Sequence, residues 1–532
     1  MKKYLRFVFG LRKYFKNRIT PQEAIERARK TLRERVSHRQ ENFLRLLEQG
    51  VFNYAKSPYK PLLKNRKIGL EDIKKWVGNE GIEQTLVKLQ ADGVYFTVDE
   101  FKGKTQVNRD GLNFEVNEKS FDNPFVSEAY EVRSGATRSA GTRIRIDFDY
   151  LVQRSLYDAF ILNLHEALTS PIANWFPVFP GAPGINSSLR FARIGNPPRR
   201  WFSQVEKSKL KVNWEKRWGV SYIFFMSHLM GVPLAKPEYV SLNNAQDIAR
   251  WAASMLEEHS NCVIYTFASS AVRVCIAAKE AGLNIKGTRF LVTGEPLTPQ
   301  KKKEIEETGA MAVPIYGISE AGVIAAGCPQ PYPDSDTCHS LMDTTAIISH
   351  RLRPSHSDVE VDSFLFTSLL YESPKILLNV GMGDHGKVWD EPCSCEFGKL
   401  GFNAHVSRIR SYEKLTGEGV TFVDTDFIHI IEKELPQRYG GQSTDYQLVE
   451  EEDARGLTRL RLLISPRVGQ VDEQALAETF IQLLKKGENS PESWSQSGSE
   501  IWAQARTLRV RREFPIPTRS GKILPFHIVK PE

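Results

Sequence analysis

Three short apolar runs alternate with helical stretches between positions 262 and 315. The runs cover positions 262–267, 290–292 and 312–315. Position 269 to 281 has helical character, and 298–308 reads as a charged helix that begins at a threonine followed by proline. This order predicts strand–helix–strand–helix–strand, which is typical of a parallel, doubly wound sheet. In such sheets, ligands bind beyond the carboxyl ends of the strands.

Helical patterns dominate the N-terminal part of the chain. Thr20 and Pro21 form a capping residue followed by proline, and positions 22–47 then carry apolar residues at helical spacing. Positions 73–77 and 81–89 predict two shorter helices.

The C-terminal part has a different pattern. Positions 446–450 and 457–464 predict the arms of a hairpin, 472–486 an amphipathic helix, and 508–514 a basic strand. We therefore expect an α/β protein, in which a large N-terminal domain with doubly wound sheets is followed by a small mobile α+β C-terminal domain. The expected units are a helical segment at 1–100 packed on the large domain, the large domain at 101–409, and the small domain at 410–532.

The composition is that of an ordinary globular protein, with 41% hydrophobic and 26% charged residues. A length of 532 residues predicts two to four structural units. No run of about 18 apolar residues occurs, so we expect no transmembrane helix. Six cysteines in a long chain without a signal-peptide pattern favour a cytoplasmic protein over a disulfide scaffold.

The first 18 positions combine seven lysines or arginines with five aromatic residues. An amphipathic helix of this kind either contacts an anionic membrane or packs its aromatic side chains and leaves its cations in water. We favour packing over membrane contact. The net charge of +8 is mild for this length, and we expect no nucleic-acid partner.

A hydroxyl-rich segment at 133–143 contains four hydroxyls, two glycines and three arginines. Glycine lets backbone N–H groups turn toward an anion, and arginine offers planar donors to phosphate oxygens. The segment fits a polyphosphate-binding loop or a polar surface turn, and it matches neither common nucleotide motif. The candidate phosphate-binding residues are Ser134, Gly135, Thr137, Arg138 and Thr142.

Two polar segments follow expected strands at the carboxyl edge of the sheet. The first consists of Gly294, Glu295 and Pro296, and the second covers 316–320. In the second, a tyrosine can stack on a base, a serine can bond a phosphate or carboxylate, and a glutamate can hold Mg²⁺. Positions 317–321 also resemble the G-x-S-x-G elbow of a serine hydrolase, with Ser319 as the nucleophile and alanine in place of the last glycine.

A late lysine follows a proline-rich segment. Lys522 comes after prolines at 515 and 517 and a Ser-Gly turn. It is either a solvated surface charge or a cation that neutralises a carboxylate and an α-phosphate brought together for reaction.

Taken in order, these segments resemble the adenylate-forming superfamily, and its phenylacetate–CoA ligase-like branch in particular, from about position 57 to 531. Six segments carry the resemblance: 133–142 occupies the place of the Ser-Ser-Gly-Thr-Thr-Gly phosphate loop, 294–298 is similar to Gly-(Ala/Gly)-Glu-Pro, 316–320 matches Tyr-Gly-x-Ser-Glu, 383–384 resembles Thr-(Arg/Gly)-Asp, 410–413 resembles the Gly-Arg-Ser-Asp-Asp hinge, and 518–522 matches the final Ser-Gly-Lys.

The resemblance implies that ATP and a small carboxylic acid give acyl-AMP and pyrophosphate, with Mg²⁺ as the metal. The small domain then swings, and a thiol of CoA or of an acyl carrier protein attacks to give a thioester. The residue roles that it implies are these: Tyr316 stacks on adenine beside Gly317, Ser319 bonds the carboxylate or phosphate, Glu320 binds Mg²⁺, Asp384 and Arg410 hold the ribose, and Lys522 bridges the reacting oxyanions.

Two segments depart from the family pattern. Arg138 stands where the phosphate loop usually has its second glycine, and Tyr412 and Glu413 replace the usual aspartate pair of the hinge. These departures leave open a catalytically altered relative that acts as a binding protein. The identity of the acid is not encoded in any motif, although the aromatic stretches 175–181 and 222–226 are candidates for a pocket lining or for core.

The cysteines offer one metal-binding pattern. By the same resemblance, Cys328, His339, Cys393 and Cys395 form a candidate tetrahedral Zn²⁺ site, for which Cys338 is a spare ligand. The alternative is a set of ordinary reduced cysteines, which are commonly buried.

Overall fold

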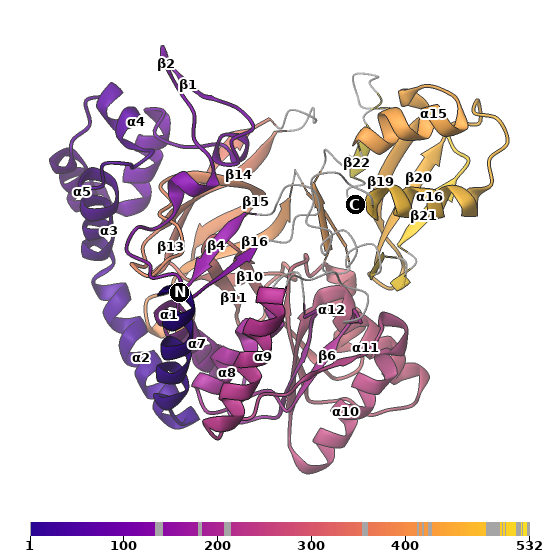
Figure 1. Ribbon diagram of the computed structural model, residues 1–532, viewed down its shortest axis with the longest axis horizontal. Helices are drawn as coiled ribbons and strands as arrows, with labels where there is room; N and C mark the ends of the chain where they lie inside the picture. The colour runs from indigo at the N-terminus through magenta and orange to yellow at the C-terminus, as the bar shows by residue number, and fades with distance from the viewer. Residues whose placement is uncertain are drawn as a thin grey trace.

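The protein is described from a computed structural model (Figure 1). The structure describes residues 2–133, 142–178, 183–206, 214–353, 360–411, 414–417, 420–423, 428–485, 501–502, 504–505, 507–517, 523 and 525–528.

A twelve-stranded sheet forms the centre of the molecule, in the order β13-β14-β15-β16-β12-β11-β10-β9-β8-β5-β6-β7. The half from β10 to β7 is parallel, and the half from β13 to β10 is antiparallel. The strands are β5 (Ile172–Trp175), β6 (Arg200–Ser203), β7 (Pro237–Tyr239), β8 (Cys262–Phe267), β9 (Thr288–Thr293), β10 (Met311–Ile318), β11 (Gly322–Gly327), β12 (Cys338–Ser340), β13 (Thr345–Leu352), β14 (Val361–Ser368), β15 (Val380–Asp390) and β16 (Ala404–Ser411).

The predicted strand–helix alternation is confirmed. β8, β9 and β10 are parallel neighbours, joined by α11 (Ala268–Glu280) and α12 (Pro299–Glu306). Along β8, Cys262 and Ile264 pack with α10 (Ala245–Glu258) and α11, whereas Val263 and Tyr265 pack with α2 (Pro21–Ser37) and α7 (Phe148–Leu164). Helices therefore cover both faces of the strand, which explains why its sequence is a continuous apolar run.

The N-terminal helices are α1 (Lys2–Lys16), α2 (Pro21–Ser37), α3 (Arg39–Leu47) and α5 (Leu70–Ala91). Thr20 caps α2 in a capping box with Glu23, as its position before proline predicts. The pattern at 22–47 is two helices rather than one, because the chain leaves helical geometry at His38. The two short helices expected at 73–89 are the two halves of α5, which kinks at Gly81 with φ of 82°.

The aromatic residues of α1 favour the packing interpretation. Phe7, Tyr14 and Phe15 are buried, against Phe148 of α7 and Leu189 of α8 (Pro183–Arg193) among others. Within the described residues, no helix combines the length and the apolar character that crossing a bilayer requires.

A small lobe lies at one side of the large sheet (Figure 1). Its sheet has the order β21-β20-β19-β22, and α15 and α16 accompany it. The bounds are α15 (Leu435–Tyr439), β19 (Tyr446–Glu452), β20 (Thr458–Ile464), α16 (Glu473–Lys485), β21 (Leu508–Arg511) and β22 (Phe526–Ile528). The predicted hairpin and amphipathic helix are thus present, and the α/β fold with a small C-terminal α+β domain is confirmed.

Candidate functional site

A tight β-hairpin carries the segment 316–320. β10 and β11 pair antiparallel, and Ile318 faces Gly322 across the turn. A side chain at Gly317 would place its Cβ 2.7 Å from the Gly322 carbonyl oxygen, so only glycine fits there. Ser319 is exposed at the turn, and the adjacent Glu320 is buried.

This hairpin excludes the serine hydrolase interpretation. A nucleophile elbow holds its serine between a strand and a helix. Ser319 instead lies between two antiparallel strands, so the resemblance to G-x-S-x-G does not extend to the backbone.

The end of β10 meets the neighbouring antiparallel strands β15 and β16. The hydroxyl of Tyr316 donates a hydrogen bond of 2.8 Å to Asp384, 68 residues later in the chain. Burial and the Asp384 carboxylate both raise the pKa of Tyr316 well above its ordinary value. Arg410 lies on β16, which pairs with the strand β15 that carries Asp384. Its Nη1 is 3.1 Å from a carboxylate oxygen of Asp336. Three of the residues singled out from the sequence therefore belong to one region.

The segment after β9 turns sharply and is held by buried charges. Gly294 has φ of 77°, and a Cβ there would lie 2.9 Å from the Phe267 ring. The carboxylate of Glu295 accepts hydrogen bonds from Ser269 and, at 3.2 Å, from Lys301. Both Glu295 and Lys301 have side chains at most 2% exposed, so this ion pair is shielded from water.

The same ion pair reaches the small lobe. Lys301 Nζ donates to Thr458 Oγ1 at 3.5 Å, and the Thr298 hydroxyl donates to Glu452 at 2.7 Å. Glu450 projects into this contact, where burial raises its pKa to about 7 although Lys301 and Arg410 act in the opposite direction. No local pattern signalled this contact, because its members come from three distant parts of the chain.

The hydroxyl-rich segment is described only at its ends. Ser134, Gly135, Thr137 and Arg138 lie outside the described residues, and Thr142 is buried. β3 (Tyr130–Arg133) and β4 (Arg143–Ile146) pair antiparallel on either side of the segment.

Asp122 anchors the base of this hairpin. Its carboxylate forms ion pairs with Arg143, with Arg145 at 3.5 Å and with Lys375 at 2.9 Å. Lys375 is fully buried, so this carboxylate is its essential counter-charge. No local sequence pattern indicates this anchor.

Lys522 and the hinge residues Tyr412 and Glu413 lie outside the described residues. The chain on either side of Lys522 is described at Pro517 and Ile523, which form an antiparallel bridge. The preceding Ile516 is held by Gln447 of β19 through two hydrogen bonds, of 2.7 and 3.1 Å.

A separate Cys–His cluster consists of Cys328, His339, Cys393 and Cys395, whose ligand atoms all lie within 4.8 Å of one another. The Sγ atoms of Cys328 and Cys393 are 3.6 Å apart, and Cys395 Sγ is 3.1 Å from His339 Nε2. Tetrahedral zinc with Zn–S of about 2.3 Å requires sulfur atoms about 3.8 Å apart. The predicted residues have therefore been brought together at zinc-like spacing.

The surroundings of the cluster also suit a metal. Nδ1 of His339 lies 2.8 Å from the Phe402 carbonyl, which leaves Nε2 free to face the sulfur atoms. A hydrogen bond from Cys328 and a further one from His339 lower the pKa of Cys395 to about 3. A Cβ on Gly398 would collide with the Cys393 carbonyl, so glycine is required in the turn that brings Cys393 and Cys395 together. Cys338 is buried but is not one of the four.

No family model matches this chain, and no curated protein matches it. Among solved structures, it is similar to 2-hydroxyisobutyryl-CoA ligase in complex with 2-HIB-AMP and CoA in the thioesterification state. The TM-score is 0.52 at 12% identity, over 93% of this chain and 90% of that chain.

Two further similarities are weaker. The amide bond synthetase McbA from Marinactinospora thermotolerans gives a TM-score of 0.37 at 11% identity, over 74% of this chain and 67% of that one. The anthranilate CoA ligase AuaEII in complex with anthranoyl-AMP gives 0.33 at 12% identity, over 74% and 64%. On the first of the three similarities, this chain has the fold of 2-hydroxyisobutyryl-CoA ligase.

Proposed function

We propose that this protein activates a small carboxylic acid with ATP, releases pyrophosphate, and passes the acyl group to a thiol. The observation that carries the proposal is the bond between Tyr316 and Asp384 at the carboxyl end of β10. The fold brings these two residues together at the edge where doubly wound sheets bind ligands, and an aromatic ring beside a carboxylate suits a nucleoside.

Each candidate residue then has a chemical task. The Tyr316 ring covers the adenine, and the Asp384 carboxylate accepts hydrogen bonds from the ribose hydroxyls with Arg410 beside it. Glu320 offers a buried carboxylate oxygen, the ligand type that Mg²⁺ prefers, and Ser319 precedes it in the turn. Bound Mg²⁺ supplies positive charge to the phosphates during the displacement of pyrophosphate.

The phosphates belong at the hydroxyl-rich segment. We assign Ser134, Gly135, Thr137, Arg138 and Thr142 to phosphate binding, with Asp122 holding β4 on one side of the segment. Gly294 and Pro296 border the base through the backbone, because the Glu295 carboxylate is already bonded to Ser269 and Lys301.

We propose that the small lobe moves during the reaction. Successive side chains on a strand point to opposite faces. On β19, Glu450 and Glu452 face Lys301 and Thr298 of the large domain, whereas Gln447 points the other way and holds the segment that leads to Lys522. We propose that a rotation near Arg410 brings Lys522 over the acid and the α-phosphate, and that the arrangement described here serves the later, thiol-transfer step.

The acceptor is a thiol of CoA or of an acyl carrier protein, and we assign the protein to the phenylacetate–CoA ligase-like branch. The Cys–His cluster supports the branch assignment, because Cys328, His339, Cys393 and Cys395 are the set that the resemblance implies. We propose that they bind a structural Zn²⁺ that fixes the ends of β11, β12 and the 393–398 turn. A four-ligand site has no position left for a substrate, so this metal has no catalytic task.

Carboxylate-dependent ATP–pyrophosphate exchange tests the proposal. The purified protein is incubated with a panel of acids, ATP, Mg²⁺ and labelled pyrophosphate, with and without CoA. We expect exchange with one class of acids, loss of exchange in Tyr316→Ala, and a decrease of at least 100-fold in Lys522→Ala. Nucleotide binding without exchange for any acid would instead favour the binding-protein alternative.

A further inference from the structure

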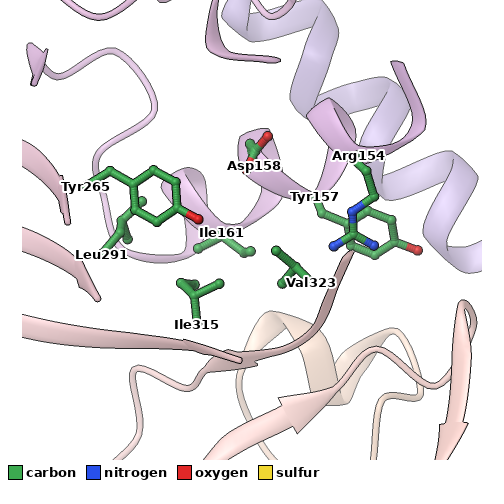
Figure 2. Close-up of a pocket in the computed structure, with 8 residues that line it drawn as sticks. All are labelled: Arg154, Tyr157, Asp158, Ile161, Tyr265, Leu291, Ile315 and Val323. Carbon is green, nitrogen blue, oxygen red and sulfur yellow. The ribbon is translucent and has the colours of Figure 1, made fainter. Parts of the chain in front are cut away.

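A small internal cavity lies between α7 and the strands that lead to Tyr316 (Figure 2). Its volume of about 10 Å³ has room for about one water-sized atom. α7 contributes Arg154, Tyr157, Asp158 and Ile161, and the sheet contributes Tyr265, Leu291, Ile315 and Val323. Ile315 and Val323 lie on β10 and β11, the two strands of the hairpin that carries the segment 316–320.

Within the described part of the chain, Arg154 is a buried arginine with one unpaired donor. It is 4% exposed, and its Nη1 has no hydrogen-bond partner. No acidic side chain among the described residues lies within ion-pair distance of it, and its guanidinium carbon lies over the Tyr157 ring, 4.8 Å from the ring centre. A buried, unpaired guanidinium donor is costly unless a ligand or water completes its bonds.

The neighbouring carboxylates are already engaged. Asp158 accepts two hydrogen bonds from Arg190, of 2.6 and 3.4 Å. The other buried carboxylate in the region, Asp343, accepts a hydrogen bond from the Tyr157 hydroxyl, and burial raises its pKa although the charges of Arg35 and Arg154 act in the opposite direction. Among the described residues, these carboxylates leave Arg154 Nη1 at the cavity wall without a hydrogen-bond acceptor.

Arg154 also lies close to the turn of the candidate site. A Cβ built on Gly322, at the start of β11, would be 3.7 Å from Arg154 Nε. The other walls are largely apolar, with Ile161, Leu291 and Ile315 among them (Figure 2). A short carbon skeleton that ends in an oxygen complements this combination of an apolar wall and one unpaired donor.

We propose that this cavity is the far end of the acid-binding pocket, and that Arg154 binds an oxygen on the acyl part of the substrate. The substrate is then a short acid with a second oxygen-bearing group, and a carboxylate is favoured over a hydroxyl because an ionised acceptor forms the stronger hydrogen bond with a guanidinium donor. This inference rests on the adenylating function proposed above and identifies the class of acid that the same site accepts.

Binding of matched acids to the full-length protein provides the test. Succinate, 4-hydroxybutyrate and butyrate, and the corresponding three-carbon series, are titrated calorimetrically in the presence of AMP. We expect the dicarboxylate of one series to bind at least 10-fold more tightly than the unsubstituted acid, with the hydroxy acid between them. Arg154→Met should remove this preference, and Arg154→Lys should retain part of it.

Arg193→Met is the matched control. Arg193 is also a buried arginine with unpaired nitrogen atoms, but it lies on α8 and does not line the cavity. Its replacement should leave the order of the three acids unchanged. The proposal is overturned if the wild-type protein shows no preference among the acids. It is also overturned if Arg154→Met weakens the binding of all acids equally, because Arg154 would then bind the reacting carboxylate or support the fold. A variant that keeps the preference would overturn it as well, because Arg154 would then contact only water.

Pyrophosphate exchange with the same acids separates this inference from the proposed function. Selective binding of the dicarboxylate without any exchange would overturn adenylation but retain the site. Exchange that favours the unsubstituted acids would retain adenylation and overturn the role of Arg154.

Discussion

Replacement of Glu450 by glutamine should remove most of the pH dependence of small-lobe docking. Glu450 lies on β19 between Glu452 of its own strand, Lys301 and Glu295 of the large domain, and Arg410 of β16. Burial dominates and raises its pKa from 4.5 to about 7. A difference of this size corresponds to about 3 kcal/mol of docking free energy between the protonated and ionised forms.

The direction follows from the raised pKa. When the lobe undocks, Glu450 becomes hydrated and its pKa returns toward 4.5, so the docked state holds the proton more tightly. Docking is therefore strongest below pH 4.5, weakens as the pH rises from 4.5 to about 7, and changes little above that. Glutamine mimics the protonated form, so Glu450→Gln should stay docked at pH 8. The smaller remaining dependence comes from Glu452, whose pKa burial also raises.

Small-angle X-ray scattering between pH 5 and 8 measures this effect as a change in radius of gyration. Glu451→Gln is the matched control, because Glu451 is the next residue on β19, points to the opposite face and pairs with Arg461 at 2.9 Å. It should behave as wild type. A wild-type radius that does not change with pH, or a change that persists in Glu450→Gln, would refute the reasoning.

Three further predictions concern the anchor, the metal and the turn. Asp122→Asn should lower the free energy of unfolding in urea by about 3–5 kcal/mol, because it leaves Lys375 buried without a counter-charge. Glu238→Gln is the control: it breaks the exposed ion pair of Glu238 with Arg200 and should cost under about 1 kcal/mol. Equal effects of the two substitutions would contradict this prediction. Cys395→Ser should abolish the binding of one equivalent of zinc and lower Tm, and zinc content equal to wild type would disprove the site. Gly317→Ala should cost about 1–3 kcal/mol of stability and reduce exchange, because its methyl group would press against the carbonyl oxygen across the hairpin; an unchanged melting curve would argue against this turn.

The fold was predictable wherever local patterns and tertiary packing agree. The run at 262–267 is apolar at every position because β8 is covered on both faces, and this is visible without any knowledge of its neighbours. Thr20 marked the start of α2 because capping depends only on nearby residues. The break at His38 was missed, since the apolar spacing continues through it and no proline or glycine marks the change.

The candidate site was predictable as residue types but not as contacts. Tyr316 and Asp384 could be singled out individually, and the Cys–His cluster could be proposed as a set. The long-range ion pairs around the site could not be predicted. Asp336 pairs with Arg410 across 74 residues, and Asp122 pairs with Lys375 across 253. Single acidic residues on loops carry no local signal of a distant cation, so these contacts emerge only from the folded chain.

The central claim is that an acid oxygen attacks the α-phosphate of ATP at the site formed around Tyr316 and Asp384. Transfer of ¹⁸O from a doubly labelled carboxylate, followed by mass spectrometry of the nucleotide after thioester formation, tests this most directly. The account predicts AMP that carries one ¹⁸O, with unlabelled pyrophosphate. Label in inorganic phosphate with ADP as the nucleotide product, or no label in any phosphorus product of a turning-over enzyme, would contradict it.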